Sequence, residues 1–144
     1  MTVQEILLPL FVEVILTFAL GFLLAVLRMG DFRAGVVREG DIALREPNWS
    51  KRTLQVSYSF SNQFELPVLF YVLTILAYIT HLAGLVFVIL AWIFVICRIL
   101  QAYVHVTSNV VRLRGLFFII SAVVLAAMWV IYVVEVLTLP RPVL

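Results

Sequence analysis

The sequence predicts an all-α integral membrane protein, a four-helix bundle of transmembrane segments. Of its 144 residues, 65% are hydrophobic and 12% are charged, whereas about 25% of the residues in a soluble domain are charged. Four separate windows are also long enough to cross a bilayer, which takes about 20 mostly apolar residues. These observations predict a single membrane domain over residues 1–144, with no soluble module.

The four predicted spans cover residues 6–27, 60–80, 82–103 and 115–137. Pro9 and Glu13 alone interrupt the apolar run of the first, and the fourth is uncharged from Gly115 to Val134. The first run is too long for a cleavable signal peptide and has no A-x-A-like cleavage site after it. We therefore expect it to remain as a membrane helix.

Basic residues fall in two of the three connections and predict the orientation of the chain. The second connection, residues 80–82, has no Lys or Arg. The first connection contains the basic residues Arg28, Arg33, Arg38, Arg45, Lys51 and Arg52, and the third contains Arg112 and Arg114. By the positive-inside rule these two connections are cytoplasmic and both termini lie on the non-cytoplasmic side. The net charge of +2 thus reflects topology and does not indicate a nucleic-acid partner.

The first connection, residues 28–57, is the only long one. Pro47 and Asn48 form a turn signal in it, and Trp49 is expected at the membrane interface. A loop of this length in a compact domain is usually functional or mobile. The single cysteine, Cys97, excludes an internal disulfide, and we expect no metal site.

A polar face opens the second span. Tyr58, Asn62 and Glu65 are three or four residues apart and so lie on one side of a helix. Pro67 follows and removes a backbone donor, which predicts a kink beside these side chains. Such a face is suited to gripping a ligand. It is equally consistent with polar contacts that only fasten neighbouring helices.

A polar stripe with the same spacing runs along the third span and beyond it. Its members are Arg98, Gln101, His105, Ser108 and Arg112. A helix projecting from the membrane would explain Arg112 but not Arg98, because an ionisable group in a span costs roughly 3 kcal/mol or more. Since residues 80–82 form a tight hairpin, Glu65 and Arg98 lie at similar depths, and we expect them to form an ion pair. The two polar faces together predict a cationic groove for a small anionic ligand.

Two further carboxylates occur in the outer halves of the first and fourth spans. Glu13 and Glu135 have no obvious basic partner in the sequence. Each is a candidate for contacts with a neighbouring subunit, and Glu13 is also a candidate proton site of a transporter. For Glu135 we favour a simpler explanation, in which the carboxylate lies at the hydrated membrane interface at the outer end of the span.

Two segments resemble the MAPEG family, the membrane-associated proteins of eicosanoid and glutathione metabolism, and in particular its small bacterial members. They are SNQFELPVLFY (61–71), which matches an Asn-x-x-Glu motif, and CRILQAYVHVTSNVVRLRG (97–115). The resemblance implies a homotrimer of four-helix bundles in a bacterial inner membrane. It also implies glutathione as co-substrate, bound between adjacent subunits near the cytoplasmic face.

The resemblance also implies roles for individual residues. Asn62 and Glu65 would hold the backbone and amine of glutathione, supported by Arg98. Arg33 or Arg38 would reach its carboxylates, and Arg112 or Arg114 would activate its thiol. The sequence departs from the family at two positions, with Tyr58 in place of an arginine and His105 in place of a tyrosine. Gln101 lies one turn before His105.

The leading hypothesis is a glutathione-dependent transferase or peroxidase acting on hydrophobic electrophiles or lipid hydroperoxides drawn from the membrane lipids. The alternative within the same fold is a non-catalytic lipid-binding or scaffolding protein. A small proton-coupled multidrug transporter is a third hypothesis. The long first connection argues against it, because such transporters have short loops throughout.

Overall fold

The computed structural model describes residues 1–44 and 47–138. Its helices are α1 (Val3–Arg33), η1 (Glu39–Asp41), α2 (Lys51–Ser61), η2 (Asn62–Phe64), α3 (Leu66–Ile79), α4 (Leu85–Val106) and α5 (Val111–Thr138). Four segments, with α2, η2 and α3 forming one of them, are long and apolar enough to cross a membrane. The fold is therefore the all-α bundle of four spanning helices that the sequence predicts.

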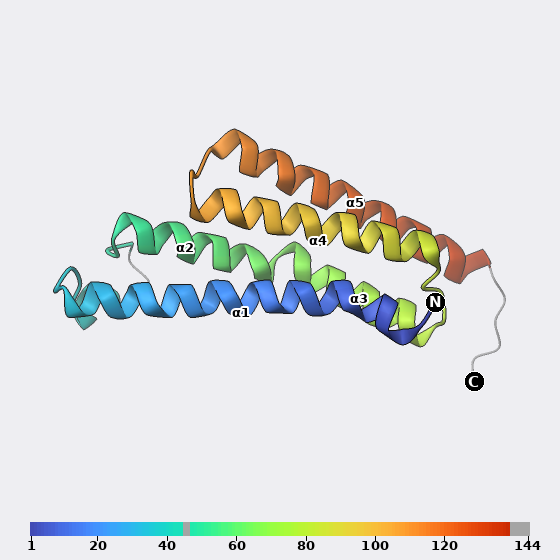
Figure 1. Ribbon diagram of the computed structural model, residues 1–144, viewed down its shortest axis with the longest axis horizontal. Helices are drawn as coiled ribbons and strands as arrows, with labels where there is room; N and C mark the ends of the chain where they lie inside the picture. The colour runs from blue at the N-terminus through green and yellow to red at the C-terminus, as the bar shows by residue number, and fades with distance from the viewer. Residues whose placement is uncertain (45–46, 139–144) are drawn as a thin grey trace.

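The helices run side by side along one long axis (Figure 1). The connection between α1 and α2 and the turn between α4 and α5 lie at one end of the bundle, the loop end. The N-terminus and the α3–α4 hairpin lie at the opposite end, the hairpin end. The connections that carry the basic residues thus share one end. Arg45, one of those residues, lies outside the described residues.

The first helix is longer than its apolar run. It begins at Val3, where Thr2 and Glu5 form a capping box, and it continues to Arg33. At 1.5 Å per residue, its 31 residues extend about 46 Å, more than the roughly 30 Å hydrocarbon core. Gly35, with a φ of 68°, ends it, because its left-handed backbone lets Val36 donate back to the Asp31 carbonyl at 2.9 Å.

The connection between α1 and α2 is shorter than the sequence suggests, because α2 begins at Lys51. Ser50 caps that helix by accepting from the Thr53 amide. Trp49 packs edge-on against Phe32 with ring centroids 5.3 Å apart, and the Arg28 guanidinium lies 5.0 Å from its ring. The connection is therefore fastened to the loop end of α1.

A tight hairpin joins α3 to α4. His81 has a φ of 57° in this turn, and the amide of Leu82 donates to the Ala77 carbonyl at 2.9 Å. This backbone pattern reverses the chain within a few residues. Beside it lies the apolar core, where α3, α4 and α5 pack around Phe70, Leu73, Phe94, Leu125 and Met128.

Candidate functional site

The second span is broken where its polar residues lie. Asn62–Phe64 forms a 3-10 turn, and Glu65 has φ and ψ values of −101° and −104°, which are not helical. The helix resumes at Leu66 with Pro67 in its first turn, where a missing backbone donor is tolerated. The kink predicted from Pro67 is confirmed, and it separates Asn62 and Glu65 from a regular helix.

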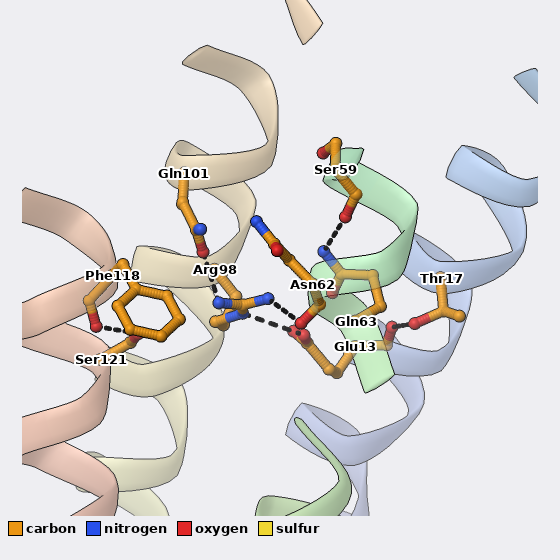
Figure 2. Close-up of polar contacts among 9 residues, drawn as sticks. All are labelled: Glu13, Thr17, Ser59, Asn62, Gln63, Arg98, Gln101, Phe118 and Ser121. Carbon is orange, nitrogen blue, oxygen red and sulfur yellow. Dashed lines mark hydrogen bonds and ion pairs between the residues drawn. The ribbon is translucent and has the colours of Figure 1, made fainter. Parts of the chain in front are cut away.

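Arg98, fully buried in α4, joins three segments of the chain. Its Nη2 donates to the Asn62 carbonyl at 2.7 Å, and its Nη1 donates to the side-chain Oε1 of Gln101. Its Nε lies 3.8 Å from Oε1 of Glu13 in α1, and Glu13 is also fully buried. Figure 2 shows these contacts, which tie α1 and the broken second span to α4.

The expected ion pair between Glu65 and Arg98 is wrong. Among the residues that the structure describes, the ion pair of Arg98 is with Glu13, and Glu65 is exposed. The expectation that Glu13 has no basic partner is wrong for the same reason. Measured from the hairpin end, Glu13, Glu65 and Arg98 all lie about 15–21 Å along their helices. Depth alone therefore does not determine which carboxylate pairs with Arg98. The break in the helix at Glu65 leaves this residue exposed, and Arg98 pairs with Glu13.

An open groove of about 530 Å³ lies between the second span, α4 and α5, and we call it the polar groove. It brings together most of the residues expected to bind a ligand. Its lining residues are Tyr58, Asn62, Glu65, Gln101, His105, Arg114, Gly115, Phe118 and Ile119. The groove therefore combines a carboxylate, amides, an imidazole and a guanidinium with the apolar surface of α5.

A chain of hydrogen bonds holds Arg114 in the first turn of α5. Its Nη1 lies 2.7 Å from Nε2 of His105 and donates to Oδ1 of Asn109 at 2.7 Å. Asn109 is in the α4–α5 turn, where its left-handed φ of 50° is tolerated better by asparagine than by most residues. This turn thus places a guanidinium and an imidazole together at one wall of the polar groove.

The structure does not bring every candidate residue to the polar groove. In residues 1–44 and 47–138, Arg33 ends α1, Arg38 precedes η1, and Arg112 is exposed in α5. None of these three residues lines the polar groove. Arg98 does not line the polar groove either, but its hydrogen bonds hold two residues that do, Gln101 and Asn62.

Sequence reasoning missed a second set of polar contacts, which hold the loop end of α4. Gln55 donates to the His105 carbonyl at 2.6 Å, and Arg52 donates to the Val106 carbonyl. These two side chains satisfy carbonyls at the helix terminus, which have no partner inside the helix. The three-residue spacing of Arg52 and Gln55 could have predicted these contacts, because it places both side chains on one face of α2.

The structure describes no group of three or more His, Cys, Asp or Glu side chains arranged to hold a metal ion in residues 1–44 and 47–138. Gln63, also missed, is buried behind the break and donates to the Ser59 carbonyl at 3.3 Å.

Comparison with known proteins identifies the family of the chain. No curated protein and no solved structure matches the chain. The model of the MAPEG family matches residues 6–134, nearly the whole chain, including every residue that lines the polar groove. The protein therefore belongs to the MAPEG family.

Proposed function

We propose that this protein is a membrane-embedded, glutathione-dependent transferase or peroxidase that acts on hydrophobic electrophiles or lipid hydroperoxides. The polar groove carries the proposal, because it combines charged and hydrogen-bonding groups with an apolar wall. Its volume of about 530 Å³ is within the usual range for small-molecule sites, about 300–1,000 Å³. Membership of the MAPEG family, which includes glutathione-using enzymes, supports it.

The groups of the groove complement those of glutathione, a tripeptide with an amine, two carboxylates, amides and a thiol. Glu65 is exposed in the groove and would pair with the amine. Asn62 and Gln101 would exchange hydrogen bonds with the peptide groups. Phe118 and Ile119 offer apolar contacts on the side of the electrophile.

Arg114 supplies the positive charge that thiol activation requires. A thiol is only slightly ionised at neutral pH, and a nearby guanidinium lowers its pKa and favours the thiolate nucleophile. Arg114 lines the groove, whereas Arg112 does not. We therefore assign this role to Arg114 and not to Arg112.

We further propose that the protein assembles as a homotrimer, with glutathione between adjacent subunits. The groove is open along one side, so that a neighbouring bundle would complete it. Arg33 or Arg38 of that neighbour would then reach the carboxylates of glutathione. Large apolar side chains such as Phe18 and Phe22, 75% and 74% exposed, would face lipid or a second subunit.

The orientation of the bundle also belongs to the proposal. Because the basic connections share the loop end, we propose that this end is cytoplasmic and that both termini are on the other side. Labelling of single cysteines introduced at exposed positions 36 and 44 from either side of the membrane tests this orientation. Labelling from the non-cytoplasmic side would overturn it.

Calorimetry of glutathione binding to the detergent-purified protein, with its mass measured under native conditions, tests the function and the assembly together. Wild type should be a trimer that binds glutathione. Asn62→Ala should weaken binding by about tenfold, the cost of roughly one hydrogen bond. Ser108→Ala is the matched control, because Ser108 is exposed beyond α4 and outside the groove.

A folded trimer that binds no glutathione would overturn the enzymatic proposal and favour a lipid-binding scaffold of the same fold. A folded monomer that binds glutathione would overturn the inter-subunit site alone. The transporter hypothesis is weakened by the ion pair between Glu13 and Arg98. A carboxylate held by a buried guanidinium is not the lone carboxylate on which that hypothesis depends.

A further inference from the structure

A second cavity, of about 500 Å³, lies between α1, α2 and the connection that joins them, and we call it the loop-end cavity. Its lining residues are Leu24, Arg28, Ile42, Pro47, Trp49, Leu54, Ser57, Tyr58, Phe60 and Ser61. Of these, Tyr58 also lines the polar groove, and the others do not. The loop-end cavity is therefore a separate space that the proposed function does not use.

The lining side chains come from facing sides of two helices. Leu24 and Arg28 are one turn apart on α1, and Ser57 and Ser61 are one turn apart on α2. The two helices run in opposite directions (Figure 1), and Arg28 lies beside Ser57. Leu24 and Phe60 then lie further from the loop end, toward the interior of the membrane. The cavity thus has a guanidinium and a hydroxyl near the loop end and apolar side chains below them.

Arg28 brings a positive charge to the loop-end cavity. Among the described residues it forms no ion pair, and no residue that lines the cavity is acidic. Its Nη2 donates a long hydrogen bond, 3.4 Å, to the Ser57 hydroxyl, and its guanidinium carbon lies 5.0 Å from the centre of the Trp49 ring. These contacts position the guanidinium but leave its charge available to an anion.

The loop-end cavity lies where lipid headgroups meet the protein. Arg28 directly follows Leu27, the last residue of the first apolar run, and tryptophan, here Trp49, is enriched at membrane interfaces. Basic side chains near the membrane surface attract anionic lipids. Guanidinium groups bind phosphate oxygens through charge-assisted hydrogen bonds. The position and the chemistry of Arg28 therefore both favour a lipid phosphate.

We propose that the loop-end cavity binds an anionic phospholipid, with its phosphate on Arg28 and Ser57 and an acyl chain along Leu24 and Phe60. The chemistry that is recognised is a phosphate with a net negative charge and a hydrophobic tail. A free phosphate shares the charge but has no group for the apolar part of the cavity. The inference goes beyond the proposed function, because it does not require glutathione.

Native mass spectrometry of the detergent-purified protein, titrated with phosphatidylglycerol or phosphatidylcholine of the same acyl chains, tests the proposal. Wild type should bind phosphatidylglycerol about fivefold more tightly, the effect expected for one arginine beside a net negative charge. Arg28→Gln should lose this preference. Arg112→Gln is the matched control, because Arg112 is exposed in the first turn of α5 and does not line the cavity. It should keep the preference.

Ser57→Leu tests the same site without changing the charge of the protein. The larger apolar side chain would occupy the space beside Arg28, so that the affinity for phosphatidylglycerol should fall although the guanidinium remains. Thermal unfolding in detergent shows that each variant is folded. Unchanged binding of phosphatidylglycerol by a folded Ser57→Leu variant would contradict the placement of the phosphate.

Three other results would overturn the inference. Equal losses in Arg28→Gln and Arg112→Gln would show general attraction to the basic loop end. Displacement of phosphatidylglycerol by millimolar inorganic phosphate would indicate a site for a free anion. Displacement by glutathione would assign the cavity to the glutathione site and leave the proposed function intact. Conversely, a wild-type protein that prefers phosphatidylglycerol but binds no glutathione would support this inference and overturn the proposed function.

Discussion

Near the hairpin end, Phe70 and Phe94 stack with ring centroids 4.6 Å apart, and Ala77 and Ala91 are fully buried beside them. Nearer the loop end, α1, η2 and α4 meet through the guanidinium of Arg98. Lipid tails are as apolar as the side chains, so the apolar half gains stability only from close packing. The polar half gains it from directional contacts that fix the rotation of each helix. We therefore expect small changes of side-chain shape to lower the stability of the apolar half only slightly, and the loss of one partner to lower that of the polar half strongly.

The largest effect should come from breaking the Arg98 ion pair. Arg98→Leu and Glu13→Gln each leave a buried group without its partner, and each should lower the free energy of unfolding by about 3–5 kcal/mol. The double variant Glu13→Gln/Arg98→Leu should recover part of the loss. Thermal unfolding in detergent measures these differences.

Glu65→Gln is the matched control for the ion pair, because Glu65 is the exposed carboxylate at similar depth. It should keep the stability of the wild type while weakening glutathione binding. A stable Glu13→Gln variant together with an unstable Glu65→Gln variant would reverse the assignment of the pair.

A smaller effect should follow from opening a cavity in the apolar half. Phe94→Ala removes a fully buried ring and should destabilise the protein by about 3 kcal/mol. Glutathione affinity per folded molecule should not change, because the groove residues keep their own contacts. Phe18→Ala, at a position 75% exposed, is the control and should keep wild-type stability. A marked loss of affinity in Phe94→Ala would show that the two halves are coupled.

The smallest effect is expected from a hydroxyl in the apolar half. Thr74 is fully buried, and its hydroxyl donates to the Phe70 carbonyl of its own helix at 2.9 Å. Thr74→Val removes a hydrogen bond inside one helix, so that the free energy of unfolding should change by only about 0.6 kcal/mol. The same unfolding assay checks it. A loss comparable to that of Arg98→Leu would mean that the apolar half also depends on a polar contact between helices.

Much of this architecture could be predicted from local pattern. The four apolar runs determine the spans, and Pro67 marks the break because it cannot donate to the backbone ladder. Residues spaced three or four apart share a face of one helix, which is why Gln101 and His105 of α4 line the same groove. The bounds of α1 and α2 were harder to predict. Their polar ends extend the helices beyond the apolar runs through caps at Thr2 and Ser50.

The sequence by itself determined the number of spans, the polar faces and the family pattern that links them. Only the tertiary structure decided that Arg98 pairs with Glu13, that Arg114 and not Arg112 lines the groove, and that Arg114 holds the ring of His105. The physical reason is that spacing along a helix defines a face but not the direction in which that face points. The rotation of each helix about its axis depends on packing against all its neighbours, and that rotation, together with the break of the second span at Glu65, selects Glu13 of two carboxylates at similar depth.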